Sequence, residues 1–145
     1  MNELTSSIAL LGAMAAAGDA AHAGPAQDYA LHCMGCHGAT AQGVPGKVPP
    51  LAHSLVRFMN NADGRRYVLR VPGAANSMLS DAQLAAVLNW VVGQFDANEL
   101  DSSTPQFAEQ EVAANRRTPM ADVLATRVAV LKEIAASGPV PATGY

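Results

Sequence analysis

The chain has 145 residues, a formal net charge of −3, 50% hydrophobic residues, 14% charged residues and two cysteines. Its basic residues do not gather with aromatic residues, so the composition gives no indication of nucleic-acid binding. The length is that of one domain, and no apolar run, including the one near the N-terminus, is long enough to span a bilayer.

The N-terminal segment has the pattern of a secretory signal peptide. Residues 8–17 are a short apolar run, and Ala21-His22-Ala23 is a small-x-small cleavage signature. We therefore expect residues 1–23 to be removed and the mature chain to lie in the periplasm. The segment before the run has no Lys or Arg and contains Glu3, which is atypical. An ordinary N-terminal helix is the alternative.

The next predicted element is a helix over residues 26–36, which leads into the stretch Cys33-Met34-Gly35-Cys36-His37. This is the C-x-x-C-H pattern to which haem is covalently attached in c-type cytochromes. Two thiols on one helical turn can each add to one haem vinyl group. The following imidazole then lies under the iron as the proximal ligand. Cys33, Cys36 and His37 are thus predicted to hold one haem c.

Zinc binding, thiol redox chemistry and a structural disulfide fit the two cysteines less well. A structural zinc site needs four Cys or His ligands, and the chain offers no second metal-binding pair. A thioredoxin-like redox motif would follow a strand, whereas the residues before Cys33 are rich in Ala. A structural disulfide between Cys33 and Cys36 would leave His37 unexplained.

Residues 38–79 read as a loop followed by short helices. Residues 38–50 are rich in Gly and Pro and predict a loop. We expect short helices over 51–59 and 65–71, with Asp63-Gly64 as a break between them and Pro72-Gly73 as the end of the second.

A longer helix is predicted over residues 81–95. Ser80 and Gln83 have the spacing of a capping box, and apolar residues then recur at helical intervals. Beyond it, every charged residue between Asp96 and Glu111 is acidic. We expect a helix over 106–116 and another that starts at Thr118-Pro119 and stops at Gly138-Pro139. The elements together predict an all-α protein.

Between Tyr29 and Phe95 the chain resembles the class I cytochromes c. The haem motif lies near the mature N-terminus, an aromatic residue precedes the first Cys by four positions, and Pro49-Pro50-Leu51 matches the family's P-x-L segment. The resemblance implies a class I cytochrome c fold around one covalently bound haem. Residues 24–95 would form the haem domain, and residues 96–145 would add extra C-terminal helices.

The resemblance also implies roles for individual residues. The carbonyl of Pro49 would accept a hydrogen bond from His37, which fixes the orientation of the imidazole and raises its basicity. Leu51 would pack on the haem. Trp90 would be the aromatic residue of the C-terminal family helix that packs against the N-terminal helix.

The sixth iron ligand is predicted from the same resemblance. The family uses a Met in the loop before its last core helix, and Met78 lies there, although Leu79 stands where a Pro is usual. A thioether ligand would raise the reduction potential. Met78 as an apolar plug, Met59 or His53 as ligand, and an open sixth position are the alternatives.

Three arginines precede that loop, namely Arg65, Arg66 and Arg70. Arg suits bidentate recognition of carboxylates, so Arg65 and Arg66 are predicted to contact the haem propionates. Ordinary surface charge is the alternative. The C-terminal segment is expected to pack on the haem domain or on a partner without binding the cofactor.

These features predict a periplasmic electron carrier and not an enzyme. Such a protein would accept single electrons from a dehydrogenase and pass them to a cytochrome or an oxidase of the respiratory chain. It could equally be the cytochrome subunit of a dehydrogenase complex. A haem enzyme or gas-binding sensor with an open sixth iron position is the alternative.

Overall fold

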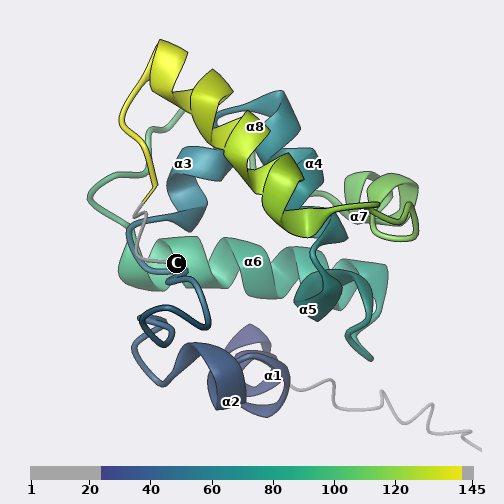
Figure 1. Ribbon diagram of the computed structural model, residues 1–145. Helices are drawn as coiled ribbons and strands as arrows, with labels where there is room; N and C mark the ends of the chain where they lie inside the picture. Colours follow the sequence, from purple (N-terminus) through teal and green to yellow (C-terminus); the bar gives the residue numbers. More distant parts are fainter. Residues whose placement is uncertain (1–23, 142–145) are drawn as a thin grey trace, which may run out of the picture.

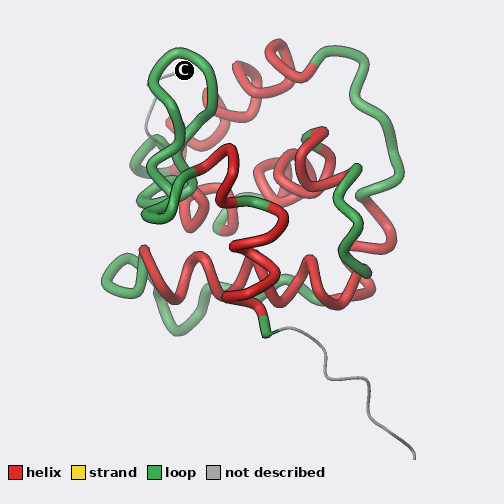
Figure 2. The backbone as a smooth tube through the Cα atoms, turned by 90° about the horizontal axis from the view of Figure 1, so that it is seen from below, coloured by secondary structure: helices red, strands yellow, loops and turns green. Residues whose placement is uncertain are grey.

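A computed structural model describes residues 24–141, and the predicted signal peptide lies outside this range. Its described part consists of helices and loops, with one isolated bridge between Val44 and Val48 (Figure 2). The helices are α1 (Pro25–His32), α2 (Met34–His37), α3 (Leu55–Met59), α4 (Ala62–Arg70), α5 (Pro72–Ala75), α6 (Asp81–Phe95), α7 (Glu109–Asn115) and α8 (Val123–Ser137). The predicted all-α class is confirmed.

Helix α6 crosses the middle of the molecule (Figure 1). Helices α1 and α2 lie on one side of it, and α3, α4 and α8 lie on the other. Its start is fixed by the capping box predicted from the sequence: Gln83 N donates to Ser80 Oγ at 3.1 Å, and Ser80 N donates to Gln83 Oε1 at 3.0 Å. Trp90 of α6 meets Tyr29 of α1 with 5.4 Å between ring centroids, as the resemblance implied.

The short helices differ in detail from the prediction. The helix predicted over 26–36 is interrupted at Cys33, which separates α1 from α2. The predicted break at Asp63-Gly64 is wrong, because both residues belong to α4. Gly64 permits close packing there, since a Cβ atom would come within 2.5 Å of the carbonyl oxygen of Phe58. Asn61 caps α4 by accepting a hydrogen bond from Gly64 N at 2.9 Å.

The last helix also starts later than predicted. It begins at Val123, with Asp122 as its capping residue, and not at Thr118-Pro119. The reason is tertiary: the carbonyls of Thr118 and Pro119 accept hydrogen bonds from Arg70 at 2.9 and 2.7 Å. These bonds hold the segment against α4 in a non-helical conformation.

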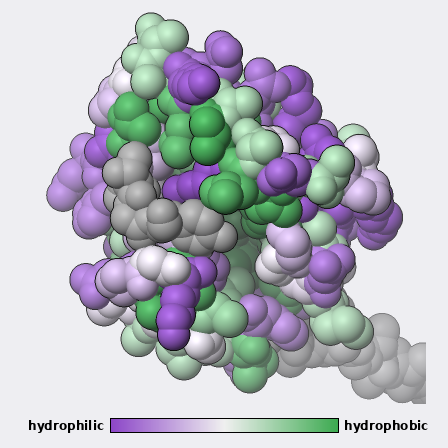
Figure 3. All heavy atoms as spheres, viewed as in Figure 1, coloured by the Kyte–Doolittle hydropathy of each residue, from purple (hydrophilic) through white to green (hydrophobic). Residues whose placement is uncertain are grey.

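The C-terminal segment, residues 96–141, packs on the rest of the molecule. Helix α7 lies on α6 and α4, and α8 lies on α4. Its inward residues are buried, namely Phe107, Val112, Val130 and Ile134. The outward face of α8 also carries apolar residues, among them Leu124 and Val128, and apolar side chains gather on the face shown in Figure 3. Among the described residues, no helix combines the length and apolar character needed to span a bilayer.

Candidate haem site

A cavity of about 300 Å³ opens beside the Cys-x-x-Cys-His motif. One part of its lining, the proximal wall, consists of His32, Cys33, Cys36, His37, Lys47, Val48, Pro49, Pro50 and Leu51. A second part, the distal wall, consists of Val68, Val71, Pro72, Gly73, Ala74, Ser77, Leu79, Val123 and Arg127. The remaining lining residues are Ser54, Leu55, Phe58, Tyr67, Leu84, Val87, Leu88 and Val91.

The motif residues follow one another on the single turn of α2. Cys33 precedes the helix, Cys36 lies within it and His37 ends it, with His37 N donating to Cys33 O at 3.0 Å. Burial raises the pKa of the Cys33 thiol, and Asp28 and Cys36 raise it further. Redox-active Cys-x-x-Cys motifs instead carry a thiol of lowered pKa. The surroundings of Cys33 therefore disfavour the thioredoxin-like alternative.

The imidazole of His37 is held by one hydrogen bond. Its Nδ1 lies 3.0 Å from the carbonyl oxygen of Pro49, the contact that the resemblance implied. Burial lowers the pKa of His37, and the bond to Pro49 opposes that effect. A neutral imidazole whose Nδ1–H is engaged leaves Nε2 available to a metal.

A glycine makes the contact with Pro49 possible. Gly43 has φ of +68° and donates its N–H to His37 O at 2.8 Å. A Cβ atom at this position would overlap the carbonyl oxygen of Val48 and lie 2.7 Å from that of Pro49. The loop can therefore bring Pro49 to His37 only because residue 43 has no side chain.

The residues of this cavity fit a covalently attached haem. Two thiols and an oriented imidazole lie together, and the lining is dominated by apolar side chains. The volume falls within the range of small-molecule and cofactor sites, about 300–1,000 Å³. A larger groove of about 510 Å³ runs along the exposed face of α8, but all its lining residues lie between 122 and 133, away from the motif.

The structure does not bring Met78 into the cavity. Its side chain is 88% exposed, whereas the neighbouring Leu79 is buried and lines the distal wall. The alternative ligands also lie outside the lining: Met59 is buried in the core, and His53 is largely exposed. Ligation by Met78 therefore stays a prediction.

The arginines of α4 lie elsewhere than the propionate prediction requires. Arg65 donates to Pro105 O at 2.6 Å and to Gln106 O at 3.1 Å, and it also pairs with Glu111. Arg66 pairs with Asp63 on the surface. Neither arginine lines the cavity. The arginines of α4 are thus used to hold the C-terminal segment and to pair locally.

The C-terminal segment itself supplies part of the cavity. Val123 and Arg127 of α8 line the distal wall, and Arg127 is only 5% exposed. Its guanidinium lies 5.4 Å from the ring centre of Phe58 and 6.0 Å from that of Tyr67. The segment therefore reaches the cavity, and the expectation that it does not bind the cofactor stays a prediction. No local pattern around Arg127 could have revealed this, because its place depends on how α8 docks.

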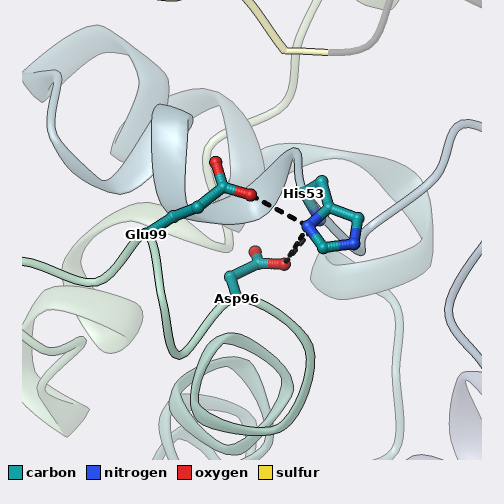
Figure 4. A group of neighbouring side chains, drawn as sticks. All are labelled: His53, Asp96 and Glu99. Atoms are coloured by element: carbon teal, nitrogen blue, oxygen red, sulfur yellow. Dashed lines mark hydrogen bonds and ion pairs between the residues drawn. The ribbon is translucent and has the colours of Figure 1, made fainter.

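A second group of polar side chains joins α3 to the end of α6 (Figure 4). His53, which has φ of +57°, has its Nδ1 2.9 Å from Glu99 Oε1 and donates its backbone N–H to buried Asp96. Arg57 donates to the other Glu99 oxygen at 2.6 Å. The carboxylates of Asp96 and Glu99 both accept hydrogen bonds from groups at α3. This group is therefore a structural link between α3 and the end of α6.

Comparison with known proteins identifies similar sequences. The chain is 33% identical over 139 aligned residues to a cytochrome c-552 of Thermus thermophilus; the match covers 81% of this chain and 90% of that protein. A second cytochrome c-552 of Thermus thermophilus is 32% identical over 116 residues, covering 66% of this chain and 88% of that protein. The first match covers more of the chain than residues 1–95 contain, so the similarity reaches into the C-terminal segment. No protein-family model matches the chain.

Proposed function

Since the chain belongs to the class I c-type cytochromes, we propose that it carries single electrons with one haem c held in the cavity between the proximal and distal walls. It is a c-type cytochrome involved in electron transfer. The observation that carries the proposal is the arrangement of Cys33, Cys36 and His37, with His37 Nδ1 bonded to Pro49 O.

Each residue of the proximal wall has a distinct task in this proposal. The thiols of Cys33 and Cys36 attach the haem through thioether bonds, so that it stays bound in both oxidation states. His37 offers Nε2 to the iron, and Pro49 fixes the orientation of the ring and strengthens the ligand. A haem bound here supplies an iron that cycles between the ferric and ferrous states.

The remaining lining residues control the surroundings of the cofactor. Leu51 and the apolar lining residues of α6 would exclude water from the haem. The reduction potential of the haem would then depend on this burial and on the axial ligands of the iron. The positively charged side chains of Lys47 and Arg127 line the cavity and would attract the propionate carboxylates of a bound haem. Arg127 thus takes the role that the sequence pattern predicted for Arg65 and Arg66.

The location and partners follow from the sequence pattern. Residues 1–23 would direct export, so that residues 24–145 work in the periplasm. The electron donor would be a periplasmic dehydrogenase, and the acceptor another cytochrome or an oxidase of the respiratory chain. No substrate bond is made or broken in this scheme, so the protein is proposed to be a carrier and not an enzyme.

One observation favours a second candidate function. Met78 is 88% exposed and is not among the residues that line the cavity. With the sixth position open or weakly held, the same haem could bind a small gaseous or oxidising ligand. The protein would then be a haem enzyme or a gas-binding sensor.

Optical spectra of the exported protein separate these functions. The pyridine haemochrome spectrum and the mass of the chain report one covalent haem c. A low-spin spectrum with a near-infrared thioether band, lost in Met78→Ala together with a fall in reduction potential, supports the carrier with Met78 as ligand. A high-spin spectrum that Met78→Ala leaves unchanged supports the second candidate. A chain without covalent haem contradicts both.

A further inference from the structure

The segment of the distal wall that contains Met78 is held by one side chain of the C-terminal segment. Arg116, which directly follows α7, donates to Leu79 O at 2.8 Å and to Ser77 O at 2.8 Å. These two carbonyls lie on either side of Met78. Further contacts reach Ser77 Oγ at 3.2 Å and the carbonyls of Ala74 and Ala75 at 3.4 Å.

The guanidinium is buried in this position. Arg116 is 5% exposed, and its charge is balanced by Asp81 Oδ1 at 3.0 Å. A buried arginine with a counter-ion and several carbonyl acceptors is held in one geometry. Arg116 therefore fixes the path of the backbone whose carbonyls it contacts, in addition to neutralising the charge of Asp81.

The contacted backbone belongs to the cavity. Ala74, Ser77 and Leu79 line the distal wall, so Arg116 holds the wall from behind. The position of Arg116 is set by α7, which packs on α6 and α4 (Figure 1). A contact far along the chain thus determines which side chains of residues 77–79 face the cavity.

We propose that Arg116 is a positioning residue that holds residues 74–79 closed over the sixth coordination position and so limits access of external ligands to the iron. The inference rests on the haem site proposed above. It does not depend on whether Met78 binds iron. Both a thioether ligand and an apolar plug at Leu79 hinder an incoming ligand only while the segment is held in place.

The neighbouring Arg117 provides a matched control. Its guanidinium pairs with both oxygens of Asp81, at 3.0 and 3.2 Å, but its side chain is 67% exposed. None of its hydrogen bonds reaches the carbonyls of residues 74–79. Arg117→Gln removes a similar charge from the same counter-ion and leaves the contacts to the distal wall intact.

The test uses the haem-loaded full chain as wild type, Arg116→Gln, Arg116→Lys and Arg117→Gln. Stopped-flow mixing measures the association rate of imidazole with the ferric protein and of carbon monoxide with the ferrous protein. Loss of one to two net hydrogen bonds predicts an increase of about tenfold or more in both rates for Arg116→Gln. Arg117→Gln should change them by less than about twofold.

Two further measurements keep the result interpretable. Urea unfolding of each haem-loaded variant measures its stability. Arg116→Lys keeps the positive charge but has only one compact donor group, so its ligand-binding rates should lie between those of the wild type and Arg116→Gln. If Arg116→Gln does not fold, the Arg116→Lys protein decides, because an unchanged rate in it contradicts the proposal.

Three results would overturn the inference. An Arg116→Gln protein that is less stable but binds imidazole and carbon monoxide at wild-type rates would show a purely structural role. Slower binding than in the wild type would show that Arg116 does not keep the segment closed. Absence of covalent haem from the wild type would instead refute the proposed function and this inference with it.

Discussion

The proximal and distal walls of the cavity are built in different ways. The proximal wall is one continuous stretch of chain, residues 32–51, and its geometry comes from nearby contacts such as those of Gly43 and Pro49 with His37. The distal wall combines residues 68–79 with two residues of α8 and is held from behind by Arg116. The residues proposed for haem attachment and proximal ligation are thus arranged by local contacts, whereas the distal wall also depends on contacts from the C-terminal segment.

The largest effect is expected when the proximal wall loses its attachment points. Cys33→Ser combined with Cys36→Ser should abolish covalent haem and leave a poorly folded chain, because the cofactor would fill the cavity beside the core. Mass spectrometry and acid-acetone extraction of the exported protein measure this. Met34→Ala is the control within the motif, since its side chain is 39% exposed and should not be needed for attachment.

A glycine substitution tests whether the proximal wall depends on its own loop. Gly43→Ala places a Cβ atom against the carbonyls of Val48 and Pro49 and should lower the free energy of unfolding by about 3 kcal/mol. Gly46→Ala is the control: it has φ of +71° but no atom within 4 Å of the added Cβ atom, so about 1 kcal/mol of backbone strain is expected. Urea unfolding of the haem-loaded proteins measures both, and equal losses would contradict the steric explanation.

A smaller effect is expected where the C-terminal segment is tied to α4. Arg65→Gln removes the bonds to Pro105, Gln106 and Glu111 from a side chain that is 11% exposed, so a loss of about 2 kcal/mol is expected. Arg66→Gln removes an exposed pair with Asp63 and should cost less than about 0.5 kcal/mol. Similar losses in both variants, measured by urea unfolding, would show that the segment is not held through Arg65.

The smallest effect concerns the link between α3 and the end of α6. Burial raises the pKa of Asp96, and the negative charge of Glu99 raises it further. Hydrogen bonds from the backbone N–H groups of His53 and Val56, together with the charge of His53, lower the pKa but do not cancel the effect of burial. The stabilising contribution of Asp96 is therefore fully present below its ordinary pKa and is lost as the pH rises through its raised value. The stability of wild type relative to Asp96→Asn should fall over that interval.

Asp101 gives the opposite sign and serves as the comparison. Hydrogen bonds from the backbone and side chain of Ser103 lower its pKa. Its contribution is present above the ordinary pKa and is lost as the pH falls through the lowered value. Unfolding in urea across the acidic range distinguishes the two carboxylates, and parallel pH profiles for Asp96→Asn and Asp101→Asn would contradict this assignment.

The sequence predicted those parts of the molecule that depend on neighbouring residues. The capping box at Ser80, the long helix α6 and the hydrogen bond between His37 and Pro49 all follow from local patterns or from the family resemblance. The interruption of the helix at Cys33 and the late start of α8 do not follow from either. The start of α8 is displaced because Arg70 binds carbonyls of the preceding segment, a contact that helix propensity does not record.

The candidate site divides in the same way. Cys33, Cys36, His37, Pro49 and Leu51 line one cavity, and their roles at a haem stay predictions, while Arg65 and Arg66 lie outside the cavity. The positions of Arg127 and Arg116 could not be predicted from the sequence. A helix that is exposed to solvent and a helix that lines a buried cavity can have the same amino-acid composition. Only the docking of α7 and α8 distinguishes an arginine in water from one beside the cofactor site.

The spread of the cavity lining along the chain has a consequence for the order of folding. The motif proposed to attach the haem lies near the N-terminus, whereas the last lining residue among the described ones, Arg127, lies close to the C-terminus. Contacts between such distant segments form late, because closing a long stretch of chain carries an entropic penalty. In the proposed scheme, we therefore expect a haem to be attached at Cys33 and Cys36 before Val123 and Arg127 complete the cavity lining.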